Sequence, residues 1–186
     1  SNYTGDVIGR MESFTEDCGK PSIHFFGHTH GYSRGQSHDH NHLWVNVATA
    51  GGAIDYWGEW PQADYDEFTV TQDEWGFVMV DIEAGEDPQF VLKRISRGNE
   101  DIYRDNEIRD EIVIRFNNIP PNQPIGLFPS GIEDPDNTFL IAEDYSDADG
   151  DDLMASQWKV YQDCNLSMPV ISEFVNSENW YFNENT

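Results

Sequence analysis

The chain has 186 residues, with 35 acidic and 10 basic side chains and a formal net charge of −25 at pH 7. A strongly negative field repels nucleic acids and anionic membrane surfaces, and no apolar run approaches the roughly eighteen residues of a spanning helix, so neither nucleic acid nor membrane is expected as a partner. Aromatic residues form 13% of the chain, which excludes a disordered acidic tail and indicates a folded protein.

The first part of the chain predicts one helix followed by a series of strands. Apolar residues recur at helical spacing between Val7 and Phe14, with Asp6 as the expected N-cap and Gly19 as the expected end. The charged run 99–110 is predicted to be a solvated face. Short buried or alternating segments predict strands over 22–26, 43–47, 75–82, 89–95 and 111–116, with a hairpin between the third and fourth.

A proline-rich segment predicts a domain boundary. Three prolines within 119–124 stiffen the chain and interrupt helix or sheet, so we expect one domain over 1–118, a linker over 119–124 and a second domain over 125–186. The second domain is expected to be a small antiparallel β-sandwich, and at 62 residues it is short for a complete one. Its strand-like runs are 139–141, 156–161 and 169–171.

The six histidines are the most concentrated chemical feature of the chain. An apolar strand is expected to end at Gly27, where the loop can direct His28 and His30 toward two different metal ions. Two ions about 3.5–4 Å apart can share a bridging hydroxide and clamp a phosphate ester. The histidines are His24, His28, His30, His38, His40 and His42.

The segment around these two histidines resembles a known family. The residues Phe-Gly-His-Thr-His-Gly-Tyr-Ser-Arg at 26–34 resemble the last signature block of calcineurin-like metallophosphoesterases, nearest the purple acid phosphatase branch, and 45–52 resembles the glycine-rich strand and loop that follow. The resemblance implies an α+β, mainly β fold, the C-terminal portion of a four-layer αββα domain. It also implies that His28 and His30 each bind one metal of a dinuclear centre, which in this family pairs iron with zinc, manganese or iron.

The same resemblance sets limits on what this chain does alone. The earlier blocks of the family, which supply further aspartate, asparagine and histidine ligands, have no counterpart here, and a catalytic metal takes about three protein ligands. We therefore expect the parent protein to be a hydrolase that cleaves phosphate-ester substrates through a metal-bridging hydroxide, and the chain itself to be inactive. The acidity fits a protein that is secreted, on the cell surface or periplasmic, where salt screens self-repulsion.

Two residues that follow the histidine pair are candidate supporting groups. Tyr32 and Arg34 are expected either to orient the metal loop from behind the ligands or to contact a phosphate, since the guanidinium fork matches phosphate geometry. His24 is expected to be a strand histidine with satisfied contacts, and His38, His40 and His42 to lie in a solvated loop. The aromatic and acidic segment 55–61 is expected to be a packed surface loop.

An acidic loop in the second domain offers a different kind of metal site. Residues 144–152 place five aspartates around Gly150, and calcium prefers several oxygens from one tight loop. The sequence at 147–151, together with 155–158, resembles the strand-joining loop of fibronectin type III-like and cadherin-like modules. Calcium binding and a plain acidic hairpin turn both remain open. The calcium ligands would be Asp147, Asp149 and Asp151.

A second class of function is also open. The histidines and aspartates would equally suit a non-catalytic surface binding or adhesion module that depends on metal. An exposed strand edge could also drive self-association of the fragment. Cys18 and Cys164 are expected to be free thiols rather than a disulfide.

Overall fold

The computed structural model describes residues 3–37, 40–56, 68–134 and 138–176. Within these ranges the chain is mainly β, as expected, with a single helix, α1 (Tyr3–Cys18). The four-layer αββα architecture of a complete domain stays a prediction. The strands are β1 (Ser22–Phe26), β2 (Tyr32–Gln36), β3 (His42–Val47), β4 (Phe68–Gln72), β5 (Trp75–Glu83), β6 (Gln89–Gly98), β7 (Tyr103–Arg115), β8 (Gly126–Phe128), β9 (Ile141–Ala142), β10 (Ala155–Tyr161) and β11 (Pro169–Asn176).

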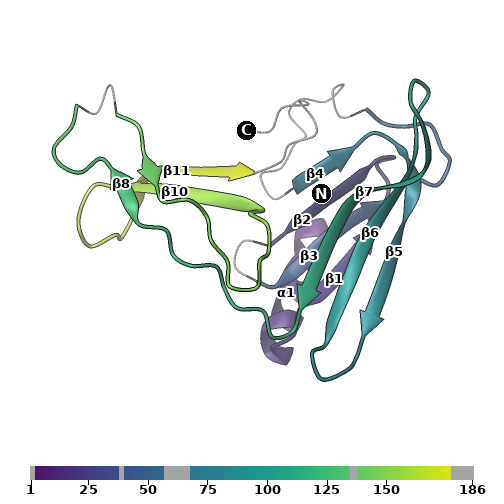
Figure 1. The fold of residues 1–186 in the computed structure, drawn as a ribbon, viewed down its shortest axis with the longest axis horizontal. Helices are drawn as coiled ribbons and strands as arrows, with labels where there is room; N and C mark the ends of the chain where they lie inside the picture. Colours follow the sequence, from purple (N-terminus) through teal and green to yellow (C-terminus); the bar gives the residue numbers. More distant parts are fainter. Residues whose placement is uncertain (1–2, 38–39, 57–67, 135–137, 177–186) are drawn as a thin grey trace. The chain divides into compact units, whose positions relative to one another are not determined.

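The first sheet has the strand order β1-β3-β2-β4 (Figure 1). β1 and β3 are parallel, whereas β2 pairs antiparallel with both β3 and β4. The chain therefore runs from β1 through β2 to β3. The loop that carries the candidate metal ligands His28 and His30 joins β1 to β2. Among the described residues β1 pairs only with β3, so its other edge is free.

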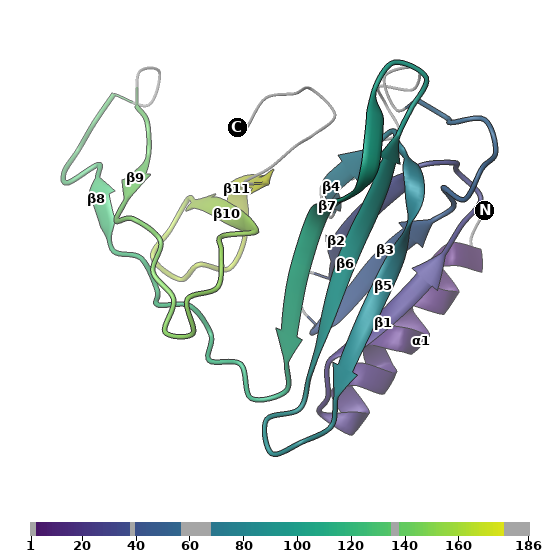
Figure 2. The ribbon, with the colours of Figure 1, turned by 45° about the vertical axis from the view of Figure 1, so that its right-hand side comes forward.

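The second sheet is an antiparallel meander, β5-β6-β7, which packs face to face with the first (Figure 2). Alternation along the strands places one side of each sheet in a shared apolar core. The helix α1 contacts β1 and β3 on the opposite face of the first sheet. The buried residues of the core are Tyr32, Leu43, Val45, Val70 and Leu92.

The chain divides into two compact units. Residues 117–153 form one unit, and the remaining described residues form the other. The first boundary lies near the predicted end of the first domain at 118. The second differs, because residues from 154 onward group with the first unit, whereas the prediction placed 125–186 together. The strand pairing agrees with this division. In the described part of the chain, β8 pairs only with β9, both within 117–153, and β10 pairs only with β11, both after residue 153.

Element positions agree with the sequence patterns in several places and depart in others. α1 ends at Cys18, and the backbone N–H of Gly19, which has a φ of +62°, donates to the carbonyl of Thr15 at 2.9 Å. Gly19 therefore ends the helix as predicted, because glycine adopts this left-handed conformation without steric cost. The helix begins at Tyr3, so Asp6 lies inside it and is not the N-cap.

The charged run at 99–110 is mostly exposed, as predicted for a solvated face, but Asp110 is an exception. β7 begins at Tyr103, eight residues before the predicted strand, and the Asp110 side chain is only 8% exposed. The reason is long-range: the carboxylate of Asp110 meets an arginine that lies 76 residues earlier in the chain. A local sequence pattern cannot predict a contact between residues that lie this far apart in the chain.

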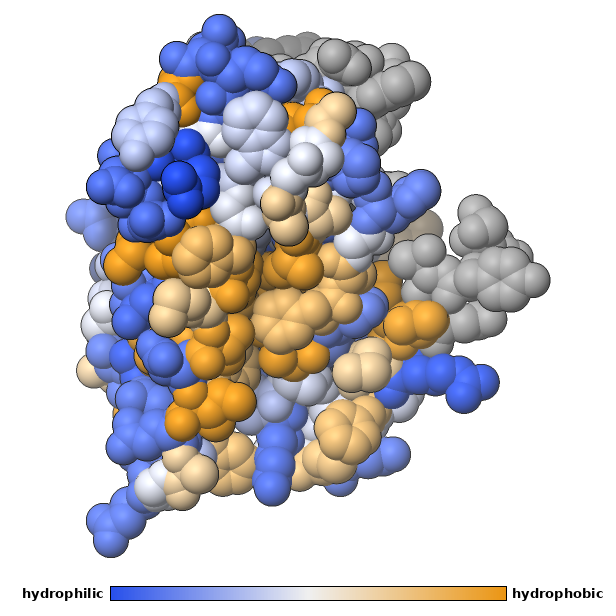
Figure 3. Space-filling view, turned by 90° about the vertical axis from the view of Figure 1, so that its right-hand side faces the viewer, coloured by the Kyte–Doolittle hydropathy of each residue, from blue (hydrophilic) through white to orange (hydrophobic). Residues whose placement is uncertain are grey.

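Apolar side chains gather on the side of the molecule that faces the viewer in Figure 3. The edge strands β1 and β5 lie on this side of Figure 1, and their exposed apolar residues include Phe25, Phe77, Met79 and Ile82. Self-association through this edge stays a prediction. Cys18 and Cys164 are both exposed free thiols, as expected, and none of the described helices is long and apolar enough to span a membrane.

Candidate metal centre

The two candidate ligands lie on an exposed loop directly after β1. The strand ends at Phe26, and His28 and His30 are both exposed. A Cβ atom at Gly27 would lie 3.2 Å from Cβ of Ala48, so the absence of a side chain lets the two segments approach closely. His28 has a φ of +130°, which is a strained backbone for a residue with a side chain. Such strain is typical of functional loops.

His30 is held by three contacts with the segment after β3. Its backbone N–H donates to Oδ2 of Asp55 at 2.9 Å, and the backbone N–H of Asp55 donates back to the His30 carbonyl at 2.9 Å. Its ring Nδ1 lies 2.7 Å from the carbonyl oxygen of Ala53. Because a carbonyl oxygen only accepts, Nδ1 carries the proton and Nε2 keeps its lone pair. Metal-binding histidines are commonly oriented in this way.

The loop that holds His30 is itself braced. The carbonyl of Thr29 accepts from Nδ2 of Asn46 at 2.9 Å, and the carbonyl of Gly52 accepts from Nε1 of Trp75 at 2.8 Å. A Cβ at Gly52 would lie 3.1 Å from the His30 ring, so the ring packs directly on the glycine backbone. Residues 46–55 therefore form a support for His30.

Tyr32 and Arg34 lie behind the loop, in the core between the two sheets. Oδ2 of Asp110 accepts from the Tyr32 hydroxyl and from Nε of Arg34, both at 2.6 Å, and Oδ1 accepts from Nη2 of Arg34 at 2.8 Å. The Arg34 side chain is 8% exposed. This placement favours support of the β2 strand over direct contact with a phosphate. Asp110 is a member of the cluster that the sequence analysis missed.

The ionisation of this cluster follows from its burial and its charges. Burial alone would raise the pKa of Asp110, but hydrogen bonding and the positive charge of Arg34 outweigh it and hold that pKa below its ordinary value. Burial and the neighbouring carboxylate raise the pKa of Tyr32 well above its ordinary value. The cluster is thus a neutral phenol with an ion pair at neutral pH.

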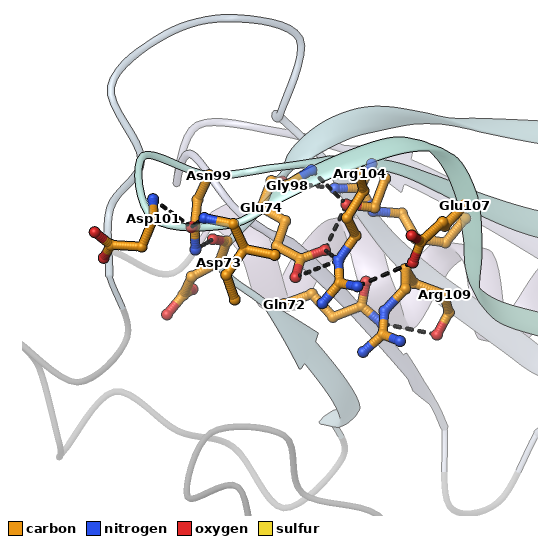
Figure 4. Close-up of polar contacts among 12 residues, drawn as sticks. Gln72, Asp73, Glu74, Gly98, Asn99, Asp101, Arg104, Glu107 and Arg109 are labelled. Carbon is orange, nitrogen blue, oxygen red and sulfur yellow. Dashed lines mark hydrogen bonds and ion pairs between the residues drawn. The ribbon is translucent and has the colours of Figure 1, made fainter.

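A second polar cluster links β4 to β7 (Figure 4). Arg104 lies between two carboxylates, with Nε 3.0 Å from Oε1 of Glu74 and Nη1 2.9 Å from Oε2 of Glu107. Nε2 of Gln72 donates to the carbonyl of Arg109 at 3.0 Å. These contacts tie the end of the first sheet to the second. The pairing of Arg104 with Glu74 and Glu107 indicates a structural role for these three side chains.

The remaining histidines do not join His28 and His30. His42 lies in β3 and is fully buried, so its prediction as a solvated loop residue was wrong. The alternation of β3 turns it inward, toward α1. His24 is half-buried in β1, and its ring Nδ1 has no hydrogen-bond partner within the described ranges of the chain. The prediction for His38 lies outside the described residues.

The aspartate loop brings its three predicted ligands together. One carboxylate oxygen from each of Asp147, Asp149 and Asp151 lies within 4.8 Å of the other two. The backbone N–H groups of Asp149 and Asp151 both donate to Oδ1 of Asp147, at 2.7 and 3.2 Å. The turn therefore gathers negative charge that a hard cation such as calcium would balance.

Comparison with known proteins found no matching family model, no matching curated protein and no matching solved structure. The resemblance to metallophosphoesterases therefore rests on the sequence of the loop alone and stays a prediction.

Replacing Asp55 tests whether this geometry serves a metal. We expect Asp55→Ala to weaken the affinity of the chain for Zn²⁺ about 10–100-fold, since loss of a group that orients a ligand typically has this effect. Asp55→Asn keeps an oxygen that accepts from the His30 N–H and should retain most of the affinity. Both constants can be measured from histidine NMR shifts. Equal affinity for D55A and the unchanged chain would remove Asp55 from the site.

Proposed function

We propose that this chain is the C-terminal part of the catalytic domain of a secreted, dinuclear-metal phosphoesterase. The observation that carries the proposal is the orientation of His30, whose Nδ1 meets the Ala53 carbonyl while Nε2 is left to bind a metal. His28 lies two residues earlier on the same exposed loop, with a strained backbone. Together they supply two imidazole ligands at the end of a sheet strand.

In this proposal the metal ions supply Lewis acidity and an activated water for the hydrolysis of phosphate esters. His28 and His30 bind and place the ions. Asp55, Ala53 and Gly52 hold the His30 ring in one orientation. The ion pair between Arg34 and Asp110 joins β2 to β7 of the second sheet. It therefore fixes the position of the strand that follows the ligands.

This chain has too few metal ligands for a catalytic dinuclear centre. Two imidazoles cannot hold two ions against water, since catalytic metals take about three protein ligands each. We therefore expect the chain alone to leave p-nitrophenyl phosphate unhydrolysed in the presence of Fe³⁺, Zn²⁺ or Mn²⁺. Turnover above the metal-only background would contradict this assignment of incomplete ligands. A gene without upstream ligand blocks would contradict the phosphoesterase proposal itself.

Binding without catalysis is the second candidate function, and the aspartate loop favours it. We propose that Asp147, Asp149 and Asp151 bind calcium, because their oxygens already converge within 4.8 Å. Asp144 and Asp152 lie beside this group but outside it.

Calorimetric titration with Ca²⁺ tests the loop. Binding of one ion per chain is expected, and Asp149→Asn should weaken it at least about tenfold, because hard cations depend on carboxylate charge. Asp144→Asn, which also removes one charge, should leave the affinity within about twofold. Absence of heat with Ca²⁺, or equal losses in both variants, would identify the loop as a plain acidic turn.

A further inference from the structure

The face of the first sheet that meets α1 is unusually polar. In β1 and β3, alternate side chains point away from the apolar core and toward the helix. These include Ser22 and His24 of β1 and His42 and Trp44 of β3, which are register partners in the parallel pair. A sheet face under a helix is normally apolar, so its polar groups need partners or a function.

Two histidines on this face form a stacked pair. The ring centroids of His24 and His42 are 6.2 Å apart, and the ring planes differ by 19°. His42 is fully buried, and its Nδ1 lies 2.6 Å from Oγ of Ser22. Nε2 of His42 and Nδ1 of His24 are both buried, and neither has a hydrogen-bond partner among the residues that the structure describes. A proton added to the His42 ring would place a charge in a buried site beside a second imidazole.

The helix docks on this pair through polar contacts. Thr15 is the only fully buried side chain of α1 among those described, and its hydroxyl bonds to the hydroxyl of Ser22. Glu12, one turn earlier, accepts from the hydroxyl of Ser37 at 2.6 Å. Apolar contact is partial, since Val7 and Phe14 are 45% and 55% exposed and Ile8 and Met11 are half-buried. A helix held in this way has little hydrophobic stabilisation to resist a change beneath it.

We propose that His42, buried under α1 and stacked on His24, makes the docking of α1 dependent on pH, so that α1 stays packed on the first sheet while the His42 imidazole is neutral and detaches when it takes up a proton. The device uses only contacts within this chain, and it is independent of the metal ligands at 28 and 30.

The charges around His42 come from three elements. Burial lowers the pKa of His42 below its ordinary value, and the nearby imidazoles of His24 and His40 lower it further, whereas the carboxylate of Glu12 on α1 opposes them. His40 is in turn 3.9 Å from Oε2 of Glu16 on α1. The net effect is a ring that resists protonation for as long as the helix covers it.

The sign of the pH effect follows from this difference. A histidine in a detached, solvated segment titrates near pH 6.5, and the docked ring titrates lower, so the detached state binds more protons below that value. Docking is therefore fully favoured above about pH 6.5. As the pH falls below it, the opening constant of α1 should rise about tenfold per pH unit for each proton taken up, until the pH passes the docked pKa.

Hydrogen exchange measured between pH 7.5 and 5, and corrected for intrinsic rates, tests the device. Amides of α1 should lose protection at about tenfold per pH unit below 6.5, while amides of β5 and β6 keep theirs. His42→Gln keeps an N–H that can donate to Ser22 but cannot titrate, so its α1 protection should be independent of pH. His28→Asn removes an exposed imidazole instead and should retain the full dependence.

NMR titration of the unchanged chain covers the case in which His42→Gln fails to dock α1 at all. The His42 ring should titrate below pH 6.5, in step with the loss of α1 protection. A His42 ring that titrates at 6.5 or above would overturn the proposal. So would α1 protection that is constant from pH 7.5 to 5, or a pH dependence that survives in a folded H42Q.

Discussion

Replacing Asp110 by alanine should lower the free energy of unfolding by about 3–5 kcal/mol, the typical cost of removing one partner from a buried ion pair. The substitution leaves the Arg34 guanidinium and the Tyr32 hydroxyl without the carboxylate that accepts from both. Arg34 is 8% exposed, so water cannot replace the lost partner without opening the core. Urea unfolding of both proteins gives the difference.

Glu111 provides the matched control for this variant. It is the next residue of β7 and is exposed, so Glu111→Ala should change stability by less than about 0.5 kcal/mol. The pH dependence gives a second check. Because the folded pKa of Asp110 is lowered, its contribution is present above pH ~4 and is lost as the pH falls through the folded value. Similar losses in D110A and E111A would mean that the buried pair does not stabilise the two sheets.

In the proposed parent enzyme, with its upstream ligand blocks, His30→Ala should lower p-nitrophenyl phosphate hydrolysis at least about 100-fold. Loss of a residue that merely orients a ligand costs about 10–100-fold, so loss of the ligand itself costs at least as much. The bound metal, measured by mass spectrometry, should fall in parallel. His40→Gln is the control, since His40 lies outside the site, and it should leave the rate unchanged. Full activity in H30A would contradict the assignment.

The position of the candidate ligands in a loop directly after a strand could be predicted from sequence, because the signal is local. An apolar strand, a glycine and two closely spaced histidines are all contained within residues 22–30, and the structure ends β1 at Phe26 as expected. The strand β2 was missed for an equally local reason. Its sequence, Tyr-Ser-Arg-Gly-Gln, lacks apolar alternation because a buried arginine and glycine occupy positions that are usually apolar.

The groups that hold the ligands could not be predicted. Asp55 lies 25 residues after His30, and the segment that contains it reads as an acidic surface loop. The contact at Ala53 is made by a backbone carbonyl, which any residue would supply. The surroundings of the other histidines depend on strand register, since Ser22 pairs with His42 only in the parallel alignment of β1 and β3.

The most direct test of the central claim is a histidine NMR spectrum recorded while Zn²⁺ is added to the chain at neutral pH. If the end of β1 is a metal site, the ring signals of His28 and His30 will shift together and at lower Zn²⁺ than those of the other four histidines. If His38, His40 or His42 responds first, or if the signals at 28 and 30 never move, the loop is not a metal centre.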